Sequence, residues 1–442
     1  MSTCRLHHLL FRFFGRSSIA ASVRTMRWLV VYSILFCAPQ LGVAQQKTLI
    51  DLDQAIDLAI AHNHALKASR TQIQQSQAQE ITAGLRPNPV LSWDSQFLPL
   101  FTPDAFSAEN LNQLQQFDLG IGYLWERGGK RKRRLQAARD QTAVTSYQVA
   151  DSERGIVFNV AQQYIAALLA NANVELATQN LESFKQTVEI SDYQYKAGQI
   201  SEGDTLKIRL QLLQFQNDFS SAQLARIQAM NSLRQLIGFD TVSADFDLVG
   251  DLRYEPLSLS LDDLQAKALN QRPDLLAAKQ GVIASRSQNL LAIANGKRDL
   301  GTSFNYSHVS GASSASLFFN IELPVFDRNQ GEKARTKYAI TQAEESAASA
   351  NQLVMTDIRN AYEALKVNQQ VLELYDSGYL KNAQDSRDIS EYAYKKGAAG
   401  LLDYLDAERS FRATQLAYRQ ALAAYKLALE QLKQATGVRR LP

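Results

Sequence analysis

The amino-acid sequence predicts a mainly helical protein with a small β part, built from two tandem repeats. Its 442 residues include only nine prolines, and none lies between Pro103 and Pro256 or between Pro324 and Pro442. Because proline interrupts helices, such stretches favour very long helices over the many short elements of an α/β enzyme. The other two observations behind this fold class are an internal repeat and four short segments in which apolar and polar residues alternate.

The first 44 residues have the pattern of an export signal behind an upstream extension. Residues 26–44 combine a charged start, ten apolar residues and a small-residue cleavage site. Ten apolar residues are too few to span a bilayer, and residues 1–25 read as the extension. Both cysteines lie in this leader, so the mature chain is expected to have no disulfide and no cysteine site. Phe36 before Cys37 argues against lipid attachment, which follows a small residue.

The charge balance excludes several classes of function. The leader holds five arginines and no acid, and the remaining chain carries 42 bases and 44 acids, a net charge of −2. Such a body has no nucleic-acid footprint. No phosphate loop, nucleophile elbow or His/Glu cluster appears, so neither an enzyme nor a cofactor is predicted. His62 and His64 are two residues apart on a predicted helix and would lie on different faces, so no metal site is predicted.

Two parts of the chain match each other. Residues 52–66 match 261–275 at an offset of 209, and residues 193–238 match 392–437 at an offset of 199. We therefore expect a first repeat over 45–250 and a second over 251–442. Each reads as helix, two strands, long helix and helix.

The helices expected in each repeat have related lengths. The expected ranges are 51–84, 130–197 and 204–237 in the first repeat, and 260–297, 327–396 and 403–436 in the second. In the first repeat the two shorter helices, placed end to end, equal the long one, which would span about 100 Å. The last helix carries two apolar stripes, one with a period near 3.67, typical of a nearly straight helix. Two stripes fit the wall of a tube, although the helix pattern alone fits an ordinary bundle equally well.

The four strand segments favour the tube. They cover residues 91–97, 117–126, 300–308 and 317–325. One face of each is apolar and the other carries small polar residues, which is typical of outer-membrane barrel strands and places Trp93, Leu119, Ile121, Phe304 and Phe319 toward lipid. A soluble sheet packed on a core is the alternative, and the export signal weighs against it. Four strands cannot close a barrel, and an open edge cannot remain in lipid. The chain is therefore expected to pool strands with copies of itself, and a trimer supplies twelve.

Two similar turns separate the long helices from the helices that follow them. The turns run over residues 195–204 and 394–403, and each carries two glycines, Gly198 and Gly203 in the first and Gly397 and Gly400 in the second. Glycine ends a helix because it tolerates a positive φ, and Asp204 and Asp403 are expected to cap the next helix.

Together with the strand-to-helix junctions at 126–131 and 323–331, these turns resemble the TolC-like outer-membrane efflux family. The resemblance covers nearly all of residues 48–438, and the second junction is most similar to the branch that serves heavy-metal pumps of the resistance-nodulation-division type. It implies a trimeric twelve-strand barrel in the outer membrane, continued by a twelve-helix tunnel across the periplasm. It also implies a passive conduit that works with a periplasmic adaptor and an inner-membrane pump.

The resemblance also implies roles for individual residues. Asp403 and Asp406 fall on an acidic pair that can form a ring at the closed entrance, and Asp204 and Tyr394 on positions whose polar links hold the tips shut. The glycine-containing turns would meet the adaptor. The sequence departs from the family at Ala399, where members can have an arginine of the lock.

The sequence leaves two alternative functions open, and also the role of one basic run. The same body could serve protein secretion, or form a periplasmic helical scaffold without a pore. The run Lys130–Arg134 reads as a solvated helix start, and contact with anionic outer-membrane lipid head groups is a secondary hypothesis.

Overall fold

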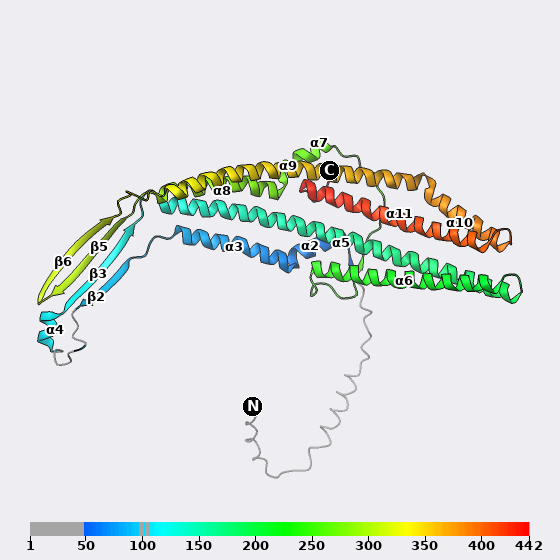
Figure 1. The fold of residues 1–442 in the computed structure, drawn as a ribbon, viewed down its shortest axis with the longest axis horizontal. Helices are drawn as coiled ribbons and strands as arrows, with labels where there is room; N and C mark the ends of the chain where they lie inside the picture. Colours follow the sequence, from blue (N-terminus) through cyan, green and yellow to red (C-terminus); the bar gives the residue numbers. More distant parts are fainter. Residues whose placement is uncertain (1–47, 97–100, 102–106, 442) are drawn as a thin grey trace, which may run out of the picture. The chain divides into compact units, whose positions relative to one another are not determined.

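A computed structural model describes residues 48–96, 101 and 107–441 of the chain. The predicted signal peptide and upstream extension lie outside these residues. The helices of the described part are shown in Figure 1. They are α2 (Leu52–His62), α3 (His64–Gly84), α4 (Ala108–Leu114), α5 (Lys130–Lys196), α6 (Glu202–Ile237), α7 (Leu261–Gln271), α8 (Pro273–Asn295), α9 (Gln330–Leu374), α10 (Leu380–Lys395) and α11 (Leu401–Thr436).

The long helices lie side by side and α5 runs through both halves of the layer (Figure 1). Next to the sheet, α3 packs on α5, α5 on α8 and α8 on α9. In the other half, α6 packs on α5, α5 on α11 and α11 on α10. The outer helices of this layer are therefore α3 and α6 on one edge, and α9 and α10 on the other.

Two expected helices are each broken into two, which corrects the predicted ranges 51–84 and 260–297. The first breaks at Asn63, whose backbone is extended and whose side chain accepts the Leu66 N–H at 3.1 Å. The second breaks at Arg272, because Pro273 disfavours the helical conformation in the residue before it. The two breaks are 209 residues apart, the same offset that aligns residues 52–66 with 261–275.

The expected helix over 327–396 is also interrupted. Between α9 and α10, residues Tyr375–Tyr379 form a π-helical turn in which Gly378 has a φ of 115°. Glycine adopts this conformation without the steric cost that other residues bear. In contrast, α5 continues for 67 residues without such a break.

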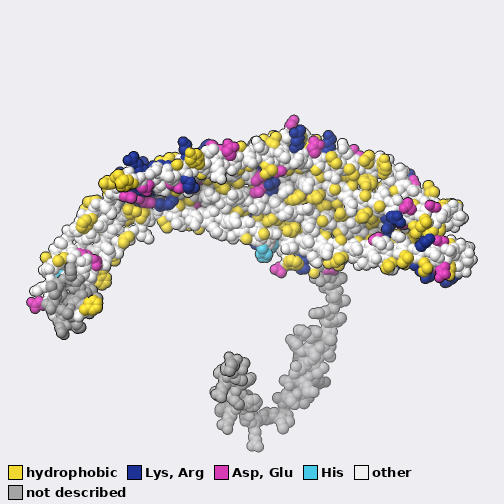
Figure 2. Space-filling model, viewed as in Figure 1, with side chains coloured by type: hydrophobic (Ala, Val, Ile, Leu, Met, Phe, Trp, Pro, Cys, Tyr) yellow, Lys and Arg dark blue, Asp and Glu magenta, His cyan; other side chains and the backbone are white. Residues whose placement is uncertain are grey.

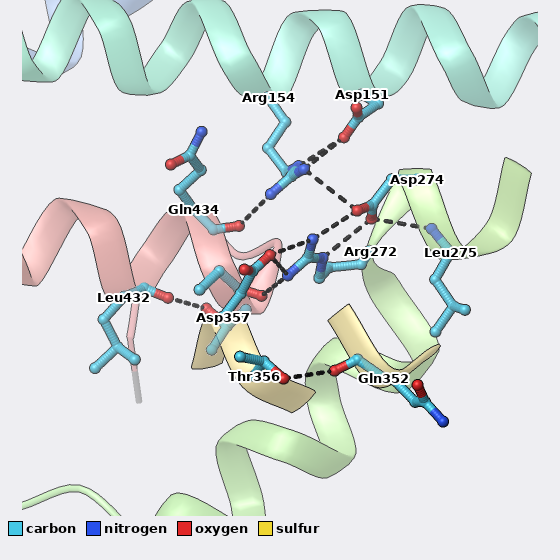
Figure 3. A network of polar contacts seen from close by, with 12 residues as sticks. Asp151, Arg154, Arg272, Asp274, Leu275, Gln352, Thr356, Asp357, Leu432 and Gln434 are labelled. Atoms are coloured by element: carbon cyan, nitrogen blue, oxygen red, sulfur yellow. Dashed lines mark hydrogen bonds and ion pairs between the residues drawn. The ribbon is translucent and has the colours of Figure 1, made fainter. Parts of the chain in front are cut away.

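A buried arginine joins the helices at the second break (Figure 3). The Arg272 side chain is 2% exposed and donates to Asp274 at 2.5 Å and to Asp357 of α9 at 3.0 Å. Burial by itself raises the pKa of Asp274, but the hydrogen bonds and charge of Arg272 outweigh it and hold that pKa below its usual value. Nearby, Arg154 of α5 donates to the Gln434 carbonyl of α11 at 2.7 Å. Because removing one partner leaves a buried charge, a break in this network costs about 3–5 kcal/mol.

Four antiparallel strands form one sheet in the order β2-β3-β5-β6. They are β2 (Val90–Gln96), β3 (Gln116–Trp125), β5 (Leu300–Val309) and β6 (Ala312–Ile321). The predicted fourth strand at 317–325 is displaced, since Leu323 and Val325 lie beyond its end. Ile321 pairs with Leu300, the first residue of β5, so no partner continues the ladder past it.

The strand register places the apolar side chains on one face. Trp93 pairs with Leu119, Ile121 with Phe304, and Thr302 with Phe319. Side chains of paired residues share a face, so these residues line the same side, as the alternation predicts. The face is uncovered in the single chain, with Trp93 73% and Phe319 65% exposed.

A second, two-stranded parallel sheet was not predicted. It joins β1 (Leu49–Ile50) to β4 (Asp247–Leu248), which lies between the two predicted repeats' helices. Two residues per strand give too little alternation to recognise. None of the helices in the described part of the chain has the length and apolar character needed to cross a bilayer.

Candidate functional site

The two helical turns at the end opposite the sheet have the same backbone geometry. Gly198 and Gly397 have φ values of 70° and 71°. The N–H of Gly198 donates to the Tyr195 carbonyl, and that of Gly397 to the Tyr394 carbonyl. These bonds satisfy the open carbonyls at a helix end. Gly198 and Gly397 therefore end α5 and α10 as predicted.

The aspartates of these turns lie one turn deeper in the helices than predicted. Ser201 and Gly400 occupy the N-cap positions of α6 and α11, so the prediction that Asp204 and Asp403 are the caps is wrong. The Asp403 carboxylate accepts the Gly400 N–H at 3.1 Å. The Asp204 carboxylate accepts the Ser201 hydroxyl at 2.9 Å. An acid in this position stabilises the helix start through the backbone donors and the helix dipole.

The other two tip glycines have ordinary backbones. Gly203 lies in the first turn of α6, and Gly400 has a φ of −75°. All four predicted tip glycines are exposed. They lie at the ends of the two helical pairs, but only Gly198 and Gly397 depend on glycine's conformational freedom.

A small apolar cluster joins the two turns. Phe184 of α5 and Phe215 of α6 stack at 4.4 Å between centroids, and Tyr404 of α11 packs with them. The Tyr404 hydroxyl lies 3.4 Å from the Thr187 hydroxyl of α5. Burial raises the pKa of Tyr404 to about 12. The cluster therefore fixes α11 on the first helical pair within one chain.

Tyr394 and Asp204 are near each other but are not bonded within one chain. Burial, and after it the charge of Asp204, raises the pKa of Tyr394. The Tyr394 hydroxyl is buried and completes no hydrogen bond with good geometry among the described residues, although the Ser191 hydroxyl is near enough to act against the rise in its pKa. Asp204 instead accepts from Ser201 and lies 3.6 Å from the Lys207 ammonium.

Asp403 and Asp406 are exposed on α11 and have separate partners. Asp403 holds the Gly400 N–H, and Asp406 lies 3.5 Å from Arg409 with three quarters of its side chain exposed. Their three-residue spacing places both on one face of the helix. Ala399, the departure from the family pattern, lies in the turn just before them, and its N–H donates to the Ala393 carbonyl at 3.3 Å.

One buried acid near the tips was missed in the sequence. Glu408 is 8% exposed, and its carboxylate lies 4.0 Å from Arg387 of α10. Burial raises the pKa of Glu408, while Arg387 and Arg412 lower it. A signal was present, since Leu401, Tyr404, Glu408 and Phe411 follow helical spacing and Glu408 is the one acid in that stripe. The Arg387 guanidinium also lies 4.9 Å over the Phe411 ring.

The basic run at the start of α5 is largely used inside the chain, which corrects its reading as a solvated helix start. Lys130 pairs with Asp299 at 2.8 Å and Arg134 with Glu126 at 2.6 Å. Arg134 also donates to the Ala83 and Leu85 carbonyls, and Arg131 to the Gly84 carbonyl. These contacts cap the end of α3 with positive charge, where the helix dipole favours it.

The histidine pair lies at a helix break instead of within one helix. His62 ends α2 and His64 begins α3, and both are exposed. Within the described ranges, no group of three His, Cys, Asp or Glu side chains could hold a metal ion.

A hollow of about 1150 Å³ lies on one side of α3, α5, α8 and α9. Its lining is mainly apolar and rich in alanine, with amide side chains such as Gln141 and Gln342 between them and charged side chains such as Arg134 and Asp274 as well.

Comparison with known proteins identifies the family. The model of the outer membrane efflux protein family matches residues 55–239 and 264–438. The cobalt-zinc-cadmium resistance protein CzcC of Cupriavidus metallidurans is 24% identical over 408 residues, which cover 87% of this chain and 93% of CzcC. The cation efflux system protein CusC of Escherichia coli is 23% identical over 397 residues, covering 84% of this chain and 81% of CusC.

Solved structures share the fold. A crystal structure of CusC superposes with a TM-score of 0.73 at 20% identity, covering 89% of this chain and 94% of CusC. A membrane protein from Pseudomonas aeruginosa superposes with a TM-score of 0.75 at 20% identity, covering 89% of this chain and 91% of that one. These comparisons agree with the predicted transport role without catalysis: the chain belongs to the outer membrane efflux protein family.

Proposed function

We propose that three copies of this chain form an outer-membrane efflux channel with a twelve-strand barrel and a twelve-helix periplasmic tunnel. The observation that carries the proposal is the four-stranded sheet, whose edge strands β2 and β6 are each paired on one side only and whose apolar face is exposed. Strands of ten residues are about 33 Å long, and tilted by about 45° they match an apolar band of about 25 Å. Joining β6 of one copy to β2 of the next would leave no open edge.

The helices support the same ring. One edge carries exposed apolar side chains on α6, and the other carries them on α9 and α10. They are Leu206, Leu210, Leu213, Leu224 and Ile227 on α6, and Leu353, Val367, Leu374, Ile389 and Tyr392 on α9 and α10. Because the two edges differ, contact between them is head to tail, and such contacts close into rings.

The internal repeat explains why one chain contributes two similar helical pairs, which are two of the six pairs in the proposed ring of three copies. We infer that residues 45–250 and 251–442 each supply two strands and one helical pair. The equivalent breaks at Asn63 and Arg272, 209 residues apart, support this division.

The channel is a passive conduit, and its energy comes from an inner-membrane pump joined through a periplasmic adaptor. The exposed turns around Gly198, Gly203, Gly397 and Gly400 form the end that meets the adaptor. Asp403 and Asp406 of three copies supply six carboxylates at the entrance, and Asp204 and Tyr394 form part of its closure between copies. The closeness of Asp204 to Tyr394 within one chain supports this, since the charge of Asp204 contributes to raising the pKa of the Tyr394 hydroxyl.

The substrates we propose are heavy-metal cations. CzcC and CusC are named for cobalt, zinc and cadmium resistance and for cation efflux. A carboxylate ring would favour cations over anions.

Reconstitution tests the function. Protein extracted from outer membranes should have the mass of a trimer in detergent and should conduct cations in planar bilayers. Cells that lack their own cation-efflux channel should regain cobalt, zinc or cadmium tolerance when this chain is expressed with its pump and adaptor. A membrane-extracted monomer, or a trimer without conductance, would overturn the proposal.

A further inference from the structure

The charges of the chain change abruptly at the ends of the sheet. Residues 87–126 and 299–327, which contain all four strands, have no Lys or Arg. The ten residues on the helical side of each boundary, 77–86, 127–136, 289–298 and 328–337, together hold thirteen Lys or Arg and two acids. Figure 2 shows Lys and Arg side chains gathered where the sheet gives way to the helices.

Part of this charge is neutralised within the chain. Lys130, Arg134, Arg298 and Arg335 form ion pairs with acids at the same boundary. A second group has no hydrogen bond or ion pair from its side chain to any described residue and is exposed. These cations are Arg86, Lys132, Arg133, Lys297 and Lys337, whereas the charge of the exposed Arg127 acts on Asp299.

The unpaired cations lie in a narrow layer. Among those on helices, Lys337 is the farthest from the helix end that faces the strands: it lies seven residues, or about 10 Å, after the start of α9. Each side of a bilayer has a head-group layer of about 5–8 Å, and Lys and Arg side chains extend to reach it.

Exposed apolar side chains occupy the same boundary. Leu323 is 75% and Phe326 is 91% exposed, in the loop between β6 and α9. Trp125, at the end of β3, is 54% exposed. Aromatic and apolar side chains beside cations are typical of a membrane interface, where the rings enter the lipid and the charges meet phosphates.

We propose that Arg86, Lys132, Arg133, Lys297 and Lys337, with Leu323 and Phe326, form a junction belt that binds the phosphates of anionic phospholipids in the periplasmic leaflet of the outer membrane. This rests on the proposed function, which places the sheet in that membrane and the helices in the periplasm. The belt repeats three times around the trimer. It fixes the depth of the barrel in the bilayer and orients the tunnel, because the opposite end of the sheet has no cation to compete for phosphates.

Native mass spectrometry of the full chain in detergent tests the belt. Phosphatidylglycerol and phosphatidylcholine are added separately to delipidated protein, and bound lipids are counted. The test variant is K132Q/R133Q/K297Q/K337Q. The matched control is K67Q/R359Q/K366Q/K381Q, which removes four exposed cations with no described partner from helices away from the boundary.

Because basic side chains attract anionic lipid, the parent should prefer phosphatidylglycerol by about tenfold, which corresponds to about 1.4 kcal/mol. The control should keep that preference, and the test variant should bind both lipids within about twofold. If the test variant does not assemble, the parent's preference should still fall steeply between 50 and 500 mM salt, as expected for exposed charges.

Three outcomes would overturn the belt. The parent could bind both lipids equally, millimolar inorganic phosphate could displace bound phosphatidylglycerol, or the parent could bind lipid A, which belongs to the other leaflet, in preference to phosphatidylglycerol. The same spectra separate this proposal from the channel. A trimer without lipid preference refutes the belt alone, and a monomer that prefers phosphatidylglycerol refutes the channel alone.

Discussion

The rings of Tyr394 and Tyr404 stack almost parallel, with 7° between their planes and 5.6 Å between their centroids. They differ in their hydroxyl groups. The Tyr404 hydroxyl lies 3.4 Å from the Thr187 hydroxyl, whereas that of Tyr394 has no bonding partner in the described part of the chain. The stacked pair therefore holds two buried hydroxyls in different surroundings, one beside Thr187 and the other near Asp204.

Substituting the two tyrosines should give different results. Tyr404→Phe removes a buried hydrogen bond and should lower the free energy of unfolding by about 1 kcal/mol. Tyr394→Phe removes a hydroxyl that completes no hydrogen bond within the described residues, so it should leave thermal stability unchanged. Because we propose that Tyr394 takes part in closing the entrance, the same variant should raise the conductance of the trimer. Thermal melts and planar-bilayer recordings measure the two effects, and Tyr338→Phe, exposed on α9, is the control. A Tyr394→Phe trimer with parental conductance would show that this hydroxyl does not close the channel.

Removing charge at the proposed entrance should weaken the block by multivalent cations. We choose Asp403→Asn with Asp406→Asn, since asparagine can still accept the Gly400 N–H and so keeps the helix start. A trivalent cation that blocks the parent at micromolar concentration should need at least tenfold more to block the double variant. Planar-bilayer recordings decide this. The control is Glu189→Gln with Glu202→Gln on the first helical pair, and equal relief in both variants would place the cation site elsewhere.

A cross-link between copies should trap the ring. Both native cysteines lie in the leader, so a disulfide in the mature chain can be attributed to the two introduced cysteines. Tyr379 and Thr414 line one hollow, which is separate from the hollow beside α3. Arg412, two residues before Thr414 on α11, pairs with Asp218 of α6 at 3.3 Å. Tyr379 therefore lies at the same height along the proposed channel axis as residues near 220 of α6. Rotation about that axis from one copy to the next does not change the height. Leu224→Cys with Tyr379→Cys should therefore give oxidised dimers and trimers on denaturing gels.

The control for this cross-link combines Leu224→Cys with Ile81→Cys. Both residues are exposed on the same edge of the helical layer, at different heights. They should remain monomeric after oxidation. Cross-linking in the control, or its absence in the test pair, would contradict the head-to-tail ring.

Arginine on the two faces of β6 should have unequal effects. Leu317 lies on the apolar face and is 61% exposed, and its neighbour Ser316 lies on the polar face. An arginine near mid-membrane on the lipid face costs about 2–4 kcal/mol, so Leu317→Arg should reduce assembled trimer far more than Ser316→Arg. Gly120 is unsuitable for this comparison, because a side chain there would meet the Asn305 amide. Similar trimer yields on native gels would refute the assigned faces.

Neutralising Glu408 should stabilise the protein at neutral pH. Its pKa in the folded chain is raised by burial, so the folded state loses stability as the pH rises through that pKa and the group becomes charged. Glu408→Gln removes this loss and should raise the melting temperature at pH 7.5. The gain should disappear at pH 4, where the parent binds the proton. Exposed Glu189→Gln should show no such difference, and a lower melting temperature for Glu408→Gln at pH 7.5 would show that the attraction of Arg387 outweighs burial.

The long elements could be predicted from the sequence because their patterns are regular. Residues 130–197 contain no proline, and α5 occupies Lys130–Lys196. Alternation placed Trp93, Leu119 and Phe304 on one face, and the strand pairing agrees. Such patterns report which side of an element is apolar, which depends only on local spacing.

The breaks and caps required information that a local pattern does not carry. Asn63 interrupts a helix because its side chain bonds the Leu66 N–H, although its neighbours follow a helical period. Asp403 looked like a cap because it is the first cap-forming residue after the glycine-containing turn, whereas the backbone begins the helix at Gly400. Lys130 and Arg134 are paired instead of solvated because Asp299 and Glu126 lie beside them. Asp299 is distant in sequence from the basic run, so a local pattern does not reveal this pairing.

The π-helical turn at Tyr375–Tyr379 makes the two helical pairs mechanically unequal. A force on the first tip is carried by α5 to the strands as by a stiff rod, since its hydrogen-bond ladder is continuous for 67 residues. On the second tip, the same force passes through α10 to Gly378, whose backbone conformation is not helical. No side chain of α10 is fully buried, so packing resists bending there only weakly. We therefore expect a displacement of α10 at that tip to bend the chain locally near Gly378, so that less of it reaches the sheet through α9.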